Sequence, residues 1–266
     1  MSERLVDEIR GRLRGERRLT ADTRLDLDFA DGVLTIEAEV DSVAVKRRLL
    51  VLGASHPAVV GIVDRLRVKP ARAMGDGDVR DHVRRALVEE LTFAELAIDG
   101  AGSPVSRAPA GRAAGAGEIG VGVADGVVTL AGTVPSLAHK RLAGVLAWWV
   151  PGTRDVVNDL DVAPPEADSD DEITDAVRLA IEKDPFVNSD AVGVATRDSV
   201  VTLTGMVPKD AEREMAELDA WYVFGVDDVR NEIVVHCGPV AGVAPEARGT
   251  PGRLGGPWHP RGTSSS

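Results

Sequence analysis

Side chains that commonly carry out catalysis or bind metals are few and scattered in this chain. Its single cysteine, Cys237, follows the last predicted strand and cannot form an intramolecular disulfide, which is typical of a reducing compartment. No nucleophile, base and orienting carboxylate assemble into a triad, and no cysteine or histidine pair has metal-ligand spacing. We predict no catalytic residue, metal, cofactor or small-molecule substrate. The histidines lie in unrelated contexts at His56, His82, His139, His236 and His259.

Two tryptophans are the strongest candidates for a binding role. Trp148 follows Asp125 at the same separation at which Trp221 follows Asp198, so the two occupy equivalent positions. Helical geometry places them beside a polar face, away from the apolar stripe. Such side chains either pack against a neighbouring module or anchor the protein to a membrane interface or a partner, and we favour packing. The predicted stripes are Leu142, Val145 and Trp149, and Met215, Leu218 and Tyr222.

Charge is spread unevenly along the chain. The net charge is −12, and residues 166–237 contain 18 Asp and Glu against 6 Lys and Arg, so phosphate backbones are repelled and nucleic acid is excluded as a partner of the whole chain. Near the amino terminus, basic residues could bind an anionic partner, but we interpret them as a solvated helix face. They are Arg10, Arg12, Arg14, Arg17, Arg18, Lys46, Arg47 and Arg48.

A turn followed by a β-rich run occurs three times and positions all these residues. The run starts at Asp125-Gly126, and copies start at Asp198 and Asp31. Asp-Gly between alternating apolar residues predicts a β-hairpin with a type I′ turn, in which both central residues have positive φ. Residues on either side of the turn then pair symmetrically. The expected pairs are Phe29/Leu34, Leu27/Ile36, Val121/Leu130, Val123/Val128, Val194/Leu203 and Thr196/Val201.

Amphipathic helices precede and follow each hairpin, and an apolar strand closes each copy. The separation between the turn and this strand is identical in all three copies, from Asp31 to Asp64, from Asp125 to Asn158 and from Asp198 to Asn231. Composition alone would not conserve that separation. We therefore predict an α+β fold of three tandem αββαβ modules at residues 1–70, 76–163 and 169–237. Each module is a small three-stranded sheet with two helices packed on it.

The second copy carries an insertion. The separation between Val79 and Asp125 is nearly twice that between Val6 and Asp31, so extra residues lie before the second hairpin. They are rich in glycine and alanine, which predicts a disordered insertion near 99–117. A phosphate-binding glycine loop is not favoured, because a strand follows these glycines where a helix is needed. Residues 238–266 are predicted to form a disordered tail.

The repeated pattern resembles the BON domain, a small αββαβ module of bacterial proteins. The hairpin reads D-G-x-V-x-L-x-G-x-V, with Gly132 and Gly205 at the family's glycine, and the last strand reads V-x-N-x-(L/I)-x-V, with Asn158 and Asn231 at its asparagine. We interpret the glycines as allowing a bulge or close passage of the second helix, and the asparagines as binding local backbone groups. The first copy is divergent, because it has alanine and aspartate at these positions, Ala38 and Asp64.

The resemblance implies a non-enzymatic module associated with attachment to phospholipid membranes, often in envelope proteins produced under osmotic stress. The amino terminus mixes charges where a signal peptide needs an apolar core, and no apolar run approaches a membrane span. We therefore expect a cytoplasmic protein, peripheral to the inner membrane where it binds lipid. The alternative is a cytoplasmic protein–protein interaction scaffold, in which the acidic third module engages a basic partner and the tandem modules add avidity.

Overall fold

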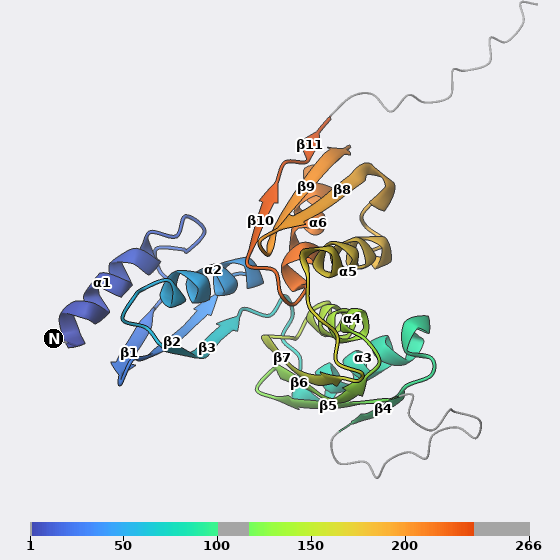
Figure 1. Ribbon diagram of the computed structural model, residues 1–266, viewed down its shortest axis with the longest axis horizontal. Coiled ribbons are helices and arrows are strands. Elements are labelled where there is room, and N and C mark those ends of the chain that lie inside the picture. Colours follow the sequence, from blue (N-terminus) through green and yellow to red (C-terminus); the bar gives the residue numbers. More distant parts are fainter. Residues whose placement is uncertain (1, 101–116, 237–266) are drawn as a thin grey trace, which may run out of the picture. The chain divides into compact units, whose positions relative to one another are not determined.

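The computed structural model describes residues 2–100 and 117–236, and three copies of one element order make up this part of the chain (Figure 1). We call residues 2–70 module 1, residues 76–163 module 2 and residues 169–236 module 3. The predicted α+β fold of three αββαβ modules is confirmed. The predicted tail and residues 101–116 of the predicted insertion lie outside the described residues.

Module 1 is a three-stranded sheet in the order β1-β2-β3 with two helices on it. β1 and β2 are antiparallel, and β3 returns parallel to β2 after the second helix. Ser42 begins this helix, because its side-chain oxygen accepts a hydrogen bond from the Val45 amide. The elements are α1 (Ser2–Arg14), β1 (Asp26–Ala30), β2 (Val33–Val40), α2 (Val43–Ala54) and β3 (Gly61–Val68).

Module 2 has one strand more than predicted. The predicted insertion starts inside β4, which pairs in parallel with β5 and covers the edge of that strand. Pairing satisfies backbone groups that an open edge would leave exposed, which explains why these residues are ordered. The elements are α3 (Asp76–Glu89), η1 (Leu91–Phe93), β4 (Ala97–Gly100), β5 (Glu118–Ala124), β6 (Val127–Val134), α4 (Leu137–Trp148) and β7 (Asp155–Val162).

Module 3 closes with an interrupted strand, where the sequence predicts a continuous one. β10 and β11 both pair in parallel with β9, but Glu232 and Ile233 lie between them. The side-chain oxygen of Asn231 accepts a hydrogen bond from the Ile233 amide at 3.2 Å, which takes this amide out of the ladder. The elements are α5 (Asp170–Lys183), η2 (Ser189–Ala191), β8 (Val192–Arg197), β9 (Val200–Val207), α6 (Asp210–Tyr222), β10 (Asp228–Asn231) and β11 (Val234–Val235).

The three hairpin turns have the predicted backbone conformation. Both central residues of each turn have positive φ, between 51° and 82°. The six predicted cross-strand pairs are all observed. In module 2 the first helix also holds the turn, because the Asp76 carboxylate accepts from the amides of Asp125 and Gly126 at 3.0 and 2.8 Å. Asp170 binds the turn of module 3 in the same way.

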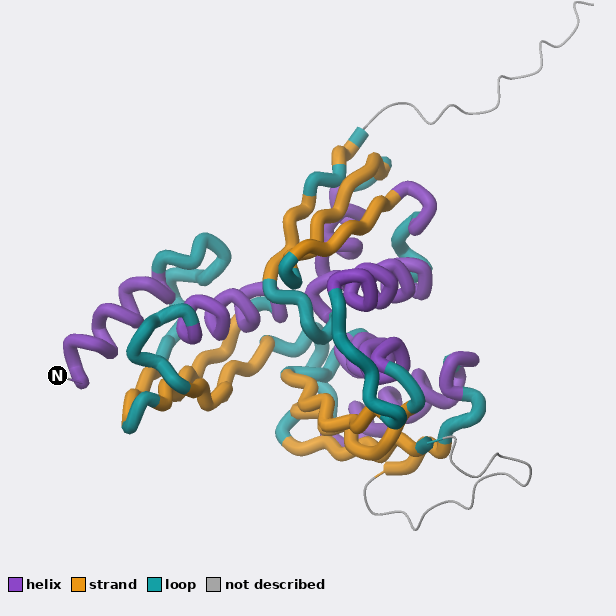
Figure 2. Tube along the Cα trace, in the orientation of Figure 1, coloured by secondary structure: helices purple, strands orange, loops and turns teal. Residues whose placement is uncertain are grey.

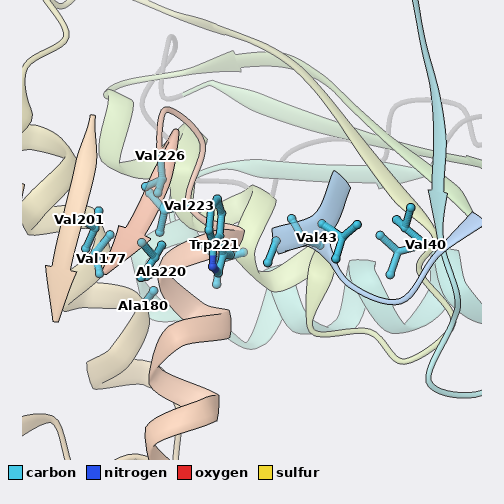
Figure 3. Packing of buried hydrophobic residues seen from close by; sticks show 14 of the residues in the cluster. Val40, Val43, Val177, Ala180, Val201, Ala220, Trp221, Val223 and Val226 are labelled. Carbon is cyan, nitrogen blue, oxygen red and sulfur yellow. The ribbon is translucent and has the colours of Figure 1, made fainter. Parts of the chain in front are cut away.

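Helices cover one face of the sheet in modules 1 and 2 (Figure 2), and the buried side chains form two clusters rather than three. One cluster fills module 2. The other runs through modules 1 and 3, takes in Val145 of module 2, and includes Trp221 and Val43, which Figure 3 shows near each other. Modules 1 and 3 therefore share a core although module 2 separates them in the sequence. This sharing makes the described residues one compact unit.

Candidate functional site

Gly132 and Gly205 allow two strands of a hairpin to approach closely. Their φ angles are +133° and +126°, a region that disfavours residues with a side chain. A Cβ at Gly132 would collide with the carbonyl oxygen of Glu118, and one at Gly205 with that of Ala191. The prediction that the second helix passes these glycines is wrong, because the close neighbour is backbone at the start of the first hairpin strand. These glycines shape the sheet.

Asn158 and Asn231 tie the last strand of their modules to the preceding helix. The side-chain amide of Asn158 donates to the carbonyl oxygen of Lys140 at 2.7 Å, and that of Asn231 donates to the carbonyl oxygen of Arg213 at 3.0 Å. The two carbonyls occupy the same position relative to the turn aspartate of their module. The asparagines and the turn residues Asp125, Gly126 and Asp198 thus have structural contacts with backbone.

Module 1 replaces the asparagine by Asp64 and makes the equivalent contact with a lysine. A carboxylate cannot donate to a carbonyl group, but Lys46, at the matching helix position, places its Nζ 2.6 Å from Asp64. The same Nζ lies 2.9 Å from Asp155 of module 2 and donates to the Leu66 carbonyl. Only 7% of the Lys46 side chain is exposed. One buried cation therefore links modules 1 and 2.

The interpretation of Lys46, Arg47 and Arg48 as a solvated helix face is wrong. Arg47 donates to the carbonyl oxygen of Val226 at 3.0 Å, and Arg48 lies 2.9 Å from the Asp228 carboxylate, so both contact module 3. The uneven charge of the chain is matched internally, because basic groups of module 1 face acidic groups of the other modules. Further ion pairs between modules are Arg18–Glu217, Arg67–Asp155, Arg154–Glu39 and Lys183–Glu90.

The two candidate tryptophans pack where modules meet. Trp221 is 1% exposed, and the ring of half-buried Trp148 stacks on Tyr222 of module 3, with centroids 5.9 Å apart and planes at 10°. These contacts favour packing between modules over an external anchor. Trp221 lies beside Glu214 and Glu217, as expected, but Glu217, one turn earlier, binds an arginine of module 1. A face that is charged in the isolated helix is therefore covered in the folded chain.

The apolar stripes of the second helices also differ from the prediction. In α6 the expected stripe of Met215, Leu218 and Tyr222 is half-buried and faces the place where the three modules meet. Other residues of this helix are fully buried. In α4 every residue from Arg141 to Ala147 is buried, because this helix packs on its own sheet and against α5 and α6. The buried residues of α6 are Ala216, Asp219, Ala220 and Trp221.

A cavity of about 490 Å³ lies where the three modules meet. Its walls are mainly apolar, and they contain four of the nine aromatic residues of the chain. This volume is within the range of roughly 300–1,000 Å³ that is common for small-ligand sites. The ring-bearing residues of the wall are Trp148, Trp149, Phe186 and Tyr222, and its ionisable groups besides Tyr222 are Asp41, Lys69, Asp184 and Asp219.

Asp184 and Asp219 form a buried pair of carboxyl groups on the cavity wall. Asp184 is 4% exposed and Asp219 is 1% exposed. The indole N–H of Trp149 donates to Asp219 Oδ1 at 3.0 Å, and the Phe186 amide donates to Asp184 Oδ1 at 2.8 Å. Burial, followed by the charge of Asp184, raises the pKa of Asp219 to about 8. Asp219 is therefore protonated at neutral pH.

We expect Asp219→Asn to make the protein more stable than the wild type at pH 9. The folded state binds the Asp219 proton more tightly than the unfolded chain, so this residue stabilises the fold fully below about pH 4 and loses that effect as the pH rises to 8. An asparagine can keep the contacts of the protonated acid. Urea denaturation at pH 5 and pH 9 measures this, with similar stabilities expected at pH 5. An equal loss of stability in both proteins between these pH values contradicts the expectation.

Residues 2–100 and 117–236 hold no cluster of histidine, cysteine, aspartate and glutamate that could bind a metal ion. Within the same ranges no helix has the length and apolar character needed to cross a bilayer. The arrangement of the described residues thus offers one feature with unusual chemistry, the open cavity with its carboxyl pair. Sequence reasoning missed it, although the spacing of Ala216, Ala220 and Val223 marks a second buried stripe that includes Asp219.

Comparison with known proteins identifies the repeated unit. The model of the BON domain matches residues 106–164 and 169–237. Both segments belong to the BON domain family. The matched segments cover the hairpin, second helix and last strand of module 2 and the whole of module 3. Module 1 shares the BON element order and carries the two substitutions described above.

Among curated proteins, this chain is similar to Osmotically-inducible protein Y of Escherichia coli (strain K12). The two are 34% identical over 122 residues, which are 44% of this chain and 61% of the relative. The chain therefore spans about three fifths of the length of that relative.

Two solved structures of CdsD, a structural protein of the type III secretion system of Chlamydia trachomatis, also match this chain. The first is 15% identical in sequence. The match covers 88% of this chain and 92% of the CdsD chain, with a TM-score of 0.23. The second, of the C-terminal domain, is 13% identical in sequence. The match covers 87% of this chain and 97% of the CdsD chain, and its TM-score is also 0.23. Similarity at this TM-score carries no argument about fold or function.

Proposed function

We propose that this protein is a non-enzymatic binding protein whose BON domains attach to the surface of a phospholipid membrane during osmotic stress. The observation that carries the proposal is the pair of BON domains, together with the similarity to Osmotically-inducible protein Y. A cytoplasmic location at the inner membrane is part of the proposal, and fractionation of cells tests it. The lipid-contacting surface must be exposed and apolar, and the two tryptophans do not supply it.

An apolar groove on module 1 provides such a surface. It lies between α2 and the start of β3, and Asp64, whose charge is matched by Lys46, is its single ionisable lining residue. Val60 projects from the groove and is 89% exposed. Exposed apolar groups of this kind gain free energy on entering the boundary of a bilayer. The remaining lining residues are Leu50, Val51, Ala54, Val59, Gly61 and Ile62.

Charge decides which lipids suit this surface. The net charge of −12 opposes contact with an anionic leaflet, and the basic residues of α2 are already bound to modules 2 and 3. Contact through the groove depends on apolar burial instead. The proposal therefore favours zwitterionic over anionic phospholipid, and its salt dependence should be weak.

We expect Val60→Glu to weaken vesicle binding about tenfold, because burial of a valine side chain is worth about 1.5 kcal/mol. Co-sedimentation with phosphatidylethanolamine and phosphatidylcholine vesicles measures the binding. The folded state should lose less than about 0.5 kcal/mol, since Val60 is exposed. Leu91→Glu is the matched control, because Leu91 is 85% exposed but lies on module 2. No pelleting of the wild type with any vesicle, or equal loss in both variants, contradicts the proposal.

A protein-interaction scaffold is the second candidate. Residues 166–237 carry twelve more acidic than basic side chains, 18 against 6, and three of these carboxylates follow one another in the first turn of α5, at Asp170, Asp171 and Glu172. This surface suits a basic protein partner. Binding of a lysine-rich polypeptide that weakens with salt, together with no vesicle binding, supports the scaffold.

A further inference from the structure

We propose that the cavity between the three modules binds a small organic cation, an ammonium group with an apolar body. This site goes beyond membrane attachment, and it rests on residues that the groove of module 1 does not use. The proposal is based on the wall of the cavity, which combines aromatic rings with buried carboxyl groups.

The aromatic side chains are concentrated at this one place. Only 3% of the chain is aromatic, yet Trp148, Trp149, Phe186 and Tyr222 all line the cavity. Phe186 is 74% exposed at its rim, so its ring is accessible to a ligand that enters the cavity. Rings around a pocket attract cations through their negative faces, and quaternary ammonium groups are recognised in this way.

The carboxyl pair supplies the charge for such a ligand. The Oδ2 atoms of Asp184 and Asp219 are buried and have no hydrogen-bond partner among the described residues. Both residues are more than nine-tenths buried and line the cavity. A bound cation would replace the proton between the two groups and leave both ionised. Buried charges are stable only when they are paired in this way.

The other ionisable groups around the cavity also favour a cation over an anion. Lys69 and Asp41 pair with each other at 2.7 Å on the rim, so their charges offset. Burial raises the pKa of Tyr222 to about 12, so this phenol stays neutral. The remaining ionisable groups in the wall are the carboxyl groups of Asp184 and Asp219. An anionic ligand would meet repulsion and find no free cationic side chain among the described lining residues.

Calorimetric titration of the full chain with choline tests this site, with 3,3-dimethylbutan-1-ol as the neutral analogue of the same shape. We expect choline to bind at least about tenfold more tightly than the alcohol, since a difference of about 1.4 kcal/mol is tenfold. Binding at pH 7 should release a proton to the buffer, and the affinity should rise as the pH approaches 8. Equal affinities for the two compounds, or no saturable binding up to about 10 mM choline, overturn the proposal.

Two variants connect the binding to this cavity. Phe186→Ala should weaken choline binding several-fold with little change in stability, whereas Phe224→Ala, at an exposed ring outside the cavity, should leave it unchanged. Asp219→Asn keeps the shape of the wall and should weaken binding about tenfold while abolishing the proton release. Unchanged binding in both Phe186→Ala and Asp219→Asn overturns the assignment to this cavity.

Vesicles separate a free solute from a lipid headgroup as the source of the cation. If free choline competes with phosphatidylcholine vesicles, the cavity holds the headgroup, and if it binds without competing, the cavity holds a solute. Both results support the site. Choline binding by a protein that does not pellet with vesicles removes the proposed membrane function and leaves this site standing, so the two proposals fail independently.

Discussion

Replacing Trp221 by alanine is expected to lower the free energy of unfolding by about 3–5 kcal/mol, the usual loss for a buried aromatic side chain. Trp221 is 1% exposed and belongs to the cluster that modules 1 and 3 share, so its loss leaves a void between modules and not only within module 3. Urea denaturation followed by circular dichroism measures the change. Trp148→Ala should lower the free energy of unfolding by less, because Trp148 is half-buried and stacks on Tyr222.

Phe224→Ala is the matched control for Trp221→Ala. It removes an aromatic ring a few positions further along the chain, but 50% of Phe224 is exposed, so the expected loss is about 1 kcal/mol. If Trp221 were an external anchor, Trp221→Ala would keep the stability of the wild type and lose vesicle binding. That combination contradicts the structure.

Lys46→Met should lower the free energy of unfolding by about 3 kcal/mol, because it removes one of the two cations that bind buried Asp155 and the cation that binds Asp64. Asp155 is 8% exposed at its side chain, and Lys46 and Arg67 are its ion-pair partners among the described residues. Methionine keeps the length and apolar character of the lysine stem, so the loss reports the charge. Chemical denaturation at pH 7 measures it.

Lys69→Met is the control for Lys46→Met, since it breaks an ion pair of similar length at the surface. Lys69 and Asp41 are 2.7 Å apart but 47% and 41% exposed, and such pairs contribute about 1 kcal/mol or less. Equal effects of the two substitutions would show that Lys46 is solvated in solution, as the sequence alone suggests. High salt should reduce the effect of Lys69→Met more than that of Lys46→Met.

The local structure of each module could be predicted from sequence because it depends on neighbouring residues. The type I′ turns follow from two Asp-Gly pairs and one Asp-Ser pair between alternating apolar residues, and the strand register follows from the turns. The constant separation between turn and last strand then defines the crossover helix. One local detail escaped, the interrupted last strand of module 3, because Asn231 binds the Ile233 amide there while Asn158 leaves its strand continuous.

The junction could not be predicted because its partners are far apart in sequence. Lys46 and Asp155, or Arg18 and Glu217, look like ordinary surface charges when each helix is considered alone. A helical wheel places Trp221 among charged residues and cannot show that an arginine of module 1 covers them. The buried pair of Asp184 and Asp219 has the same origin, since tertiary packing alone brings the end of α5 beside the face of α6.

A double-mutant cycle between Lys46→Met and Asp155→Asn tests most directly the central claim, that buried charges join the modules into one unit. The two groups lie 2.9 Å apart in different modules. The account predicts a coupling energy of about 1–3 kcal/mol between the substitutions, measured from the unfolding free energies of the wild type, both single variants and the double variant. A coupling energy of zero within error would show that module 1 and module 2 do not meet through these side chains in solution, and would contradict the account.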